Sequence, residues 1–271
     1  MTEIAPLITF FGIWVLLWLP LALGVADRFQ IPRKYPIAQE YKIPLLLPLY
    51  GVAPLAVWGY GHFFTSHRWL EYGLKWETSF WQSVGGGFLV AVVGVVLLVL
   101  VEWALGWRQV THHQQKAMPM GQGFGLIAGV LALTGFIGGI EELVFRGVLV
   151  QGLQPVISIW GVAVATSLIF AASHLLWDGL AGVTSLPGLA LMGAILLLAR
   201  WVDGGSLGLP WGLHSGWIFA IALLDTFALA PKTNPASTWL AGKPDQPLTS
   251  LLSLVLLGVT GLGLWGYHRL F

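Results

Sequence analysis

Residues 84–107 read VGGGFLVAVVGVVLLVLVEWALGW and decide the fold class of this chain. The stretch holds one ionisable residue, Glu102, and is longer than the roughly 20 apolar residues that a helix needs to cross a bilayer. Comparable apolar stretches lie near residues 4–26, 43–65, 121–140, 156–176, 180–200, 206–230 and 249–267. Because a lone helix satisfies its own backbone inside lipid, these stretches predict an all-α, polytopic integral membrane bundle of about eight transmembrane helices.

The composition excludes several classes of protein. Of 271 residues, 56% are hydrophobic and only 9% are charged, whereas about a quarter of the residues of a soluble domain are charged. The formal net charge of +1 leaves no field that would attract nucleic acid, so the predicted surroundings are the lipid bilayer and no nucleic acid. The chain has no cysteine, so any metal would have to be held by histidine, glutamate or aspartate.

The chain shows no internal repeat and no linker long enough to divide it, so we predict a single membrane domain over residues 1–271. Glycines at 121, 125 and 129 are spaced by four residues. Small residues at this spacing let two membrane helices approach closely, which predicts a helix contact along this row.

Ionisable residues inside apolar sequence are the main functional signal. They are Glu141, Glu142 and Arg146 in GGIEELVFRGVL, His174 in SLIFAASHLLW and His214 in LPWGLHSGWIFA. Each charge at mid-bilayer costs about 2.5–3.5 kcal/mol on the insertion scale, so such residues are functional candidates by default. A single intramembrane histidine also serves as a helix-to-helix hydrogen-bonding group, which leaves a structural role open for either histidine alone.

Helical geometry separates the two glutamates. Positions i and i+4 share a face, so Glu142 faces Arg146, and we interpret the two as a buried, structural ion pair. Glu141 has no partner on its own helix and lies beside Phe145. Desolvation there makes Glu141 the candidate proton acceptor.

The rise of a helix tests whether these groups share one depth. If Gln154-Pro155 is the turn after the glutamate helix, Glu141 lies about 20 Å before it and His174 about 28 Å after it. His214 lies about 12 Å into a helix that starts from the same side of the membrane. We therefore expect one carboxylate and two imidazoles to converge inside the bundle.

With these residues in view, the chain resembles the CPBP family of intramembrane proteases, the Abi-like group of CAAX-processing (Ras-converting) and bacteriocin-processing enzymes. The family motifs are E-E-x-x-x-R, F-x-x-x-H and H-x-x-x-(N/D) in an all-helical membrane domain. In this sequence they correspond to Glu141–Arg146, Phe170–His174 and His214–Ile218. The resemblance implies a catalytic core over 121–230, preceded by transmembrane helices in 1–120 and followed by a loop and a last helix in 231–271.

The resemblance implies an endopeptidase that cleaves a membrane-embedded or lipid-anchored protein or peptide in a multi-pass setting. We expect a bacterial-type inner (plasma) membrane, with the thylakoid membrane as the alternative. By this resemblance Glu141 is the general base, which holds a water with His174, while His214 stabilises the oxyanion and Phe170 has a supporting role.

The third motif departs from the family pattern, because Ile218 stands where asparagine or aspartate is usual. Asp225, seven residues further on, and Ser215 are the candidate substitutes for that polar side chain.

Three alternatives stay open at this point. A zinc enzyme would use His174, His214 and Glu141 as ligands, but the chain has no H-E-x-x-H pair, so we favour a mechanism that requires no cofactor. A non-catalytic membrane scaffold or chaperone-like binding protein is favoured by Ile218 alone. A transporter ranks last, because neither inverted repeats nor paired broken helices are evident.

Overall fold

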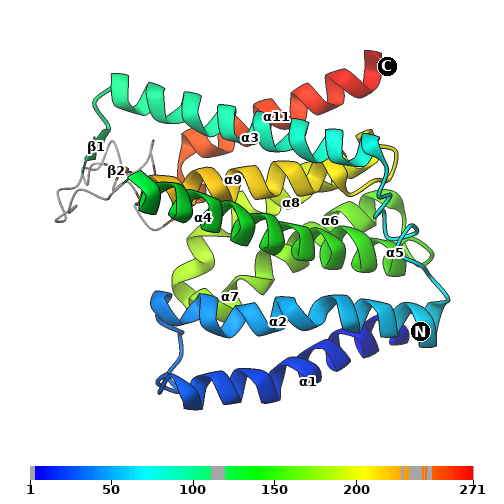
Figure 1. The fold of residues 1–271 in the computed structure, drawn as a ribbon. Helices are drawn as coiled ribbons and strands as arrows, with labels where there is room; N and C mark the ends of the chain where they lie inside the picture. The colour runs from blue at the N-terminus through cyan, green and yellow to red at the C-terminus, as the bar shows by residue number, and fades with distance from the viewer. Residues whose placement is uncertain are drawn as a thin grey trace.

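The computed structural model describes residues 4–110, 120–226, 229–231, 240, 242 and 246–270. Long helices lie side by side, with α1 and α2 along one side of the molecule and α3 and α11 along the other (Figure 1). The helical elements are α1 (Ala5–Arg28), α2 (Gln39–Tyr60), η1 (Gly61–Thr65), α3 (Thr78–Ala104), α4 (Met120–Glu141), η2 (Glu142–Val148), α5 (Leu149–Leu153), α6 (Ile159–Ser173), α7 (Leu175–Asp178), η3 (Gly179–Ser185), α8 (Leu186–Val202), α9 (Gly208–Thr226), η4 (Pro247–Thr249) and α11 (Leu251–Leu270). The predicted all-α class is confirmed.

The chain is a multi-pass membrane protein. Within the described residues, six helical runs are long and apolar enough to cross a membrane: Ala5–Arg28, Gln39–Thr65, Thr78–Ala104, Gln122–Leu153, Ile159–Val202 and Leu251–Leu270. In the most apolar stretch of α3 only 22% of the residues are buried inside the protein, as expected for a helix whose outer face meets lipid rather than water.

The predicted total of about eight spans stays a prediction. The stretches expected at 156–176 and 180–200 form one helical run, Ile159–Val202. Within this run α7 and η3 separate α6 from α8, and α6 and α8 pack on each other. The helix expected at 206–230 is α9, which at 19 residues is long enough to cross a membrane but is less apolar than the six runs. Parts of the predicted 231–271 loop lie outside the described residues.

Glycines on α9 bring it against α3. A Cβ atom at Gly208, Gly212 or Gly216 would lie 2.7 Å from the carbonyl oxygen of Phe80, 2.1 Å from that of Val84 and 2.6 Å from that of Phe88, respectively. These three glycines are spaced by four residues, so one face of α9 lacks side chains and the two backbones meet.

The helix contact predicted along residues 121, 125 and 129 is not made at the last two positions, and the surroundings of Gly121 lie outside what the structure describes. Cβ atoms at Gly125 and Gly129 would meet nothing within 4 Å. The close approach of α4 to α9 uses Gly138 and Gly139 instead, where a Cβ would lie 2.5 Å from Ser215 Oγ and 2.5 Å from the Trp211 ring. This contact sets α9 beside the glutamates at the end of α4.

Helices α1 and α2 form a hairpin that is tied by tryptophan side chains. Trp14 Nε1 donates to the Leu49 carbonyl at 2.8 Å, and Trp18 Nε1 donates to the Leu45 carbonyl at 2.9 Å. Both tryptophans and both acceptors are one helical turn apart, so the bonds fix the register of α2 on α1.

The same hairpin is tied to α7, the short helix that follows His174. Tyr35 donates to the Leu175 carbonyl at 2.7 Å, and Lys42 forms an ion pair with Asp178. These two contacts therefore hold the α1–α2 hairpin against the helix that directly follows His174.

Two short strands, β1 (Arg108–Val110) and β2 (Leu229–Pro231), pair antiparallel beyond the ends of α3 and α9. Beside them Glu102 is fully buried, and Arg108 Nε donates to its carboxylate at 2.6 Å. A charge at the end of α3 is thereby neutralised inside the protein.

Candidate active site

The two glutamates lie where the backbone changes its helix type. Helix α4 ends at Glu141, and the π-helix η2 begins at Glu142 and continues through Arg146. The wider i→i+5 turn of a π-helix is rare and is frequent at functional sites. All residues of η2 are buried, so the segment is held from every side.

Glu142 is the centre of a buried charge network. Its Oε1 accepts from Arg146 Nη1 at 3.0 Å and from His214 Nδ1 at 2.7 Å, and the side chains of Glu142 and Arg146 are 0% and 1% exposed. The contact with Arg146 is the one that the i, i+4 spacing predicts. The contact with His214, 72 residues away, was not foreseen.

The bond to Glu142 sets the tautomer of His214. Because a carboxylate only accepts, Nδ1 carries the proton, and Nε2 is the atom that faces Glu141. Glu142 therefore orients the imidazole as well as pairing with Arg146.

Arg146 has further partners that hold it in place. Its Nη2 donates to the Gly193 carbonyl at 3.2 Å, and its guanidinium lies over the Phe170 ring with Cζ 4.4 Å from the centroid. Arg200 is also buried, and it interacts electrostatically with Glu142. Glu142 thus accepts from Arg146 and His214 and has a second buried arginine near enough to interact with it.

Glu141 meets two side chains from other helices, while no partner on its own helix was expected. Its Oε1 accepts from the Tyr50 hydroxyl at 2.5 Å, and its Oε2 lies 3.5 Å from His214 Nε2. The Glu141 side chain is 12% exposed, compared with 0% for Glu142, so of the two carboxylates it is the one within reach of another molecule.

Tyr50 is a site residue that sequence reasoning missed. It lies on α2, 91 residues before Glu141, inside an apolar stretch that reads as ordinary membrane helix. No spacing rule links a tyrosine to a carboxylate over that distance, so the sequence carries no signal for the pair.

His174 sits at the end of α6 rather than inside a continuous helix. Its Nδ1 donates to the Phe170 carbonyl at 2.9 Å, which leaves Nε2 as the ring nitrogen open to another partner. The fully buried Phe170 ring contacts both imidazoles, with centroids 5.0 Å from His174 and 5.8 Å from His214. Within the described residues His174 forms no hydrogen bond or ion pair with either glutamate, so its predicted pairing with Glu141 stays a prediction.

The zinc alternative was tested against the positions of its ligands. In the described part of the chain no three histidine, aspartate or glutamate side chains gather as a metal-ligand group. Glu141 and His214 are close, but His174 does not complete a set with them, so these residues do not fit a zinc ion as placed here and we derive no step through one.

The substitutes considered for Ile218 fare differently. Asp225 lies eleven residues after His214, about 16 Å along α9, and its charged neighbour is Arg108. The supporting role predicted for Asp225 stays a prediction. Ser215 is buried beside Gly138, and its Oγ finds no hydrogen-bond partner among the residues that the structure describes.

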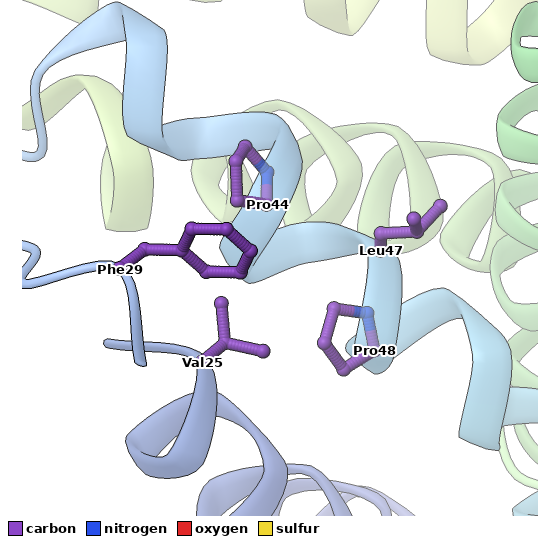
Figure 2. Close-up of a pocket in the computed structure, with 5 residues that line it drawn as sticks. All are labelled: Val25, Phe29, Pro44, Leu47 and Pro48. Carbon is purple, nitrogen blue, oxygen red and sulfur yellow. The ribbon is translucent and has the colours of Figure 1, made fainter. Parts of the chain in front are cut away.

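A pocket elsewhere in the fold does not belong to this site. It lies between α1 and α2 and is lined by apolar side chains (Figure 2), namely Val25, Phe29, Pro44, Leu47 and Pro48. Its lining offers no ionisable group, so the chemistry is concentrated where η2, α6 and α9 meet.

Taken together, the site contains a partly accessible carboxylate, an imidazole oriented by a second carboxylate, and a buried arginine. Comparison with known families shows that residues 123–220 match the family described as Type II CAAX prenyl endopeptidase Rce1-like. No curated protein and no solved structure matches the chain. The matched segment contains both glutamates, Arg146 and both histidines, while Tyr50 lies outside it. Residues 123–220 are therefore a domain of the Rce1-like type II CAAX prenyl endopeptidase family, membership of which implies an intramembrane protease.

Proposed function

We propose that this chain is an intramembrane endopeptidase that hydrolyses a peptide bond in a membrane-embedded or lipid-anchored protein or peptide, with water activated by Glu141. One observation carries the proposal: Glu141 is the partly accessible carboxylate of the pair and faces an imidazole that Glu142 already orients. A base held beside an oriented imidazole is the arrangement that general acid–base catalysis needs.

The proposed reaction proceeds in two proton transfers. Glu141 Oε2 takes a proton from water while the water oxygen bonds to the carbonyl carbon, and the carbonyl π electrons move to its oxygen. For this step His214 is the imidazolium: Nδ1 keeps its bond to Glu142, Nε2 carries a second proton taken up from solvent before the reaction, and the Nε2–H donates a hydrogen bond to that oxyanion without transferring the proton. When the C–N bond breaks, Glu141 returns its proton to the leaving nitrogen, so one water is consumed and the enzyme is restored.

His174 completes the proposal as a water-binding group. Its Nε2 lone pair accepts a hydrogen bond from the water that Glu141 activates, while the bond from Nδ1 to the Phe170 carbonyl keeps the ring in place. We further propose that the protein acts in a bacterial-type plasma membrane.

A second candidate function is a non-catalytic membrane scaffold. Ile218, which is partly buried on α9 one turn after His214, favours this candidate because it offers no hydrogen bond where the family pattern has a polar side chain. In that case the same charge network stabilises helix packing only.

The test compares membranes from cells that express the wild type, Glu141→Gln and His214→Ala. New peptide termini are sought by mass spectrometry, and Glu77→Gln, at an exposed glutamate before α3, is the matched control. We expect termini that appear with the wild type and Glu77→Gln and are absent from both site variants. If folded wild type and folded site variants give the same termini, the protease proposal fails and the scaffold replaces it.

A further inference from the structure

The α1–α2 hairpin contributes a side chain to a site that otherwise lies in residues 123–220. We propose that Tyr50 is a positioning residue, whose hydroxyl on α2 holds Glu141 so that the second carboxylate oxygen faces His214. The inference rests on the proposed function for its catalytic meaning, but the contact between Tyr50 and Glu141 can be tested without any activity.

The geometry assigns a different neighbour to each oxygen of Glu141. Tyr50 donates to Oε1 at 2.5 Å, and Oε2 lies 3.5 Å from His214 Nε2. A hydroxyl-to-carboxylate bond of this length belongs to the strong, charge-assisted class. Since a carboxylate turns easily about its last torsion, a donor on one oxygen determines where the other oxygen points.

Tyr50 is itself held firmly. It is 7% exposed, and the carbonyl of the preceding residue, Leu49, accepts from Trp14 of α1. The other end of the hairpin is tied to α7 through Tyr35 and Lys42, as described above. A hydroxyl fixed on this scaffold limits the movement of Glu141 more than a mobile side chain or a water would.

The same helix offers a matched control. Tyr60 is 5% exposed, and its ring packs on Phe10 with centroids 5.3 Å apart. Within the described residues it forms no bond to either glutamate. Tyr60→Phe therefore removes the same atom from the same helix and leaves Glu141 untouched.

The first test measures the accessibility of Glu141 to chemistry. Purified full-length protein in detergent is treated with dicyclohexylcarbodiimide, an apolar reagent for carboxyl groups, and modified peptides are quantified by mass spectrometry. Modification of Glu141 is expressed relative to the exposed Glu77 of the same chain. We expect Tyr50→Phe to raise this ratio about tenfold, because Glu141 loses a hydrogen bond made in its charged form, and Tyr60→Phe to leave it unchanged.

The second test measures the rate at which wild-type-specific termini appear in membranes with equal amounts of protein. We expect Tyr50→Phe to slow cleavage by about tenfold or more through the rate at saturating substrate, and Tyr60→Phe to leave the rate unchanged. An increase in labelling together with an unchanged cleavage rate would overturn the positioning role.

The outcomes separate the two proposals. If Glu141 labelling rises in Tyr50→Phe but the wild type produces no termini, Tyr50 holds Glu141 and the protease function fails. An unchanged labelling ratio overturns the inference whatever the activity. If Tyr50→Phe yields no folded protein, Trp14→Phe decides, because loss of the bond to Leu49 loosens α2 beside Tyr50 and should raise the ratio in the same direction.

Discussion

Glu142→Ala should lower the free energy of unfolding of this protein far more than Glu141→Gln does. The Arg146 side chain, which is 1% exposed, then loses its ion pair with residue 142. It keeps only the Gly193 carbonyl and the Phe170 ring as direct partners. Removing one partner of a buried ion pair typically costs about 3–5 kcal/mol, which corresponds to roughly 150- to 4,000-fold in the folding equilibrium. The lost bond to His214 acts in the same direction, although the two effects are not additive.

The assay is equilibrium unfolding in bicelles, read by the fluorescence of the 15 tryptophans. Glu141→Gln is the comparison, because its amide oxygen still accepts from Tyr50 and no buried cation loses its partner. We expect Glu141→Gln to stay within about 1 kcal/mol of the wild type.

A double variant tests the reason for the loss. Glu142→Leu combined with Arg146→Met removes both charges and should recover part of the stability lost in Glu142→Leu alone. Equal losses in Glu142→Ala and Glu141→Gln, or no recovery in the double variant, would refute the view that the uncompensated charge of Arg146 dominates.

Two further predictions concern helix packing and metal. Gly138→Ala should lower both stability and cleavage, because the added Cβ would lie 2.5 Å from Ser215 Oγ. Gly129→Ala has open space around the added Cβ and should stabilise α4 by up to about 1 kcal/mol. Thermal denaturation in detergent compares the two variants, and equal effects on stability would contradict the packing argument. Cleavage should survive dialysis against a metal chelator, since the three candidate ligands do not gather in the described chain; loss of cleavage that Zn²⁺ restores, with about one equivalent bound, would establish the metal mechanism instead.

Local patterns in the sequence predicted local structure well. Apolar runs of about 20 residues predicted membrane helices, because the bilayer demands that length and a helix satisfies its own backbone. The contact between Glu142 and Arg146 was predictable because the partners are four residues apart on one helical turn, and such a pair forms whatever the rest of the fold does.

Contacts between distant segments could not be predicted in this way. Both glycine rows, 121-125-129 and 208-212-216, have the same four-residue spacing, yet only the second meets another backbone in the structure at the positions described. Spacing shows that a helix has a smooth face and does not show whether a partner covers it.

The sequence by itself determined that this is a helical membrane protein with buried ionisable groups and a Glu142–Arg146 pair. The apolar composition of the chain indicates its membrane surroundings, and helix periodicity relates residues that are only a few positions apart. Only the tertiary structure decided which groups meet across helices. It brings His214 to both glutamates and places the Tyr50 hydroxyl on Glu141. The physical reason is that these partners are 72 to 91 residues apart, so their contact depends on how α2, α4 and α9 pack, which no local spacing encodes.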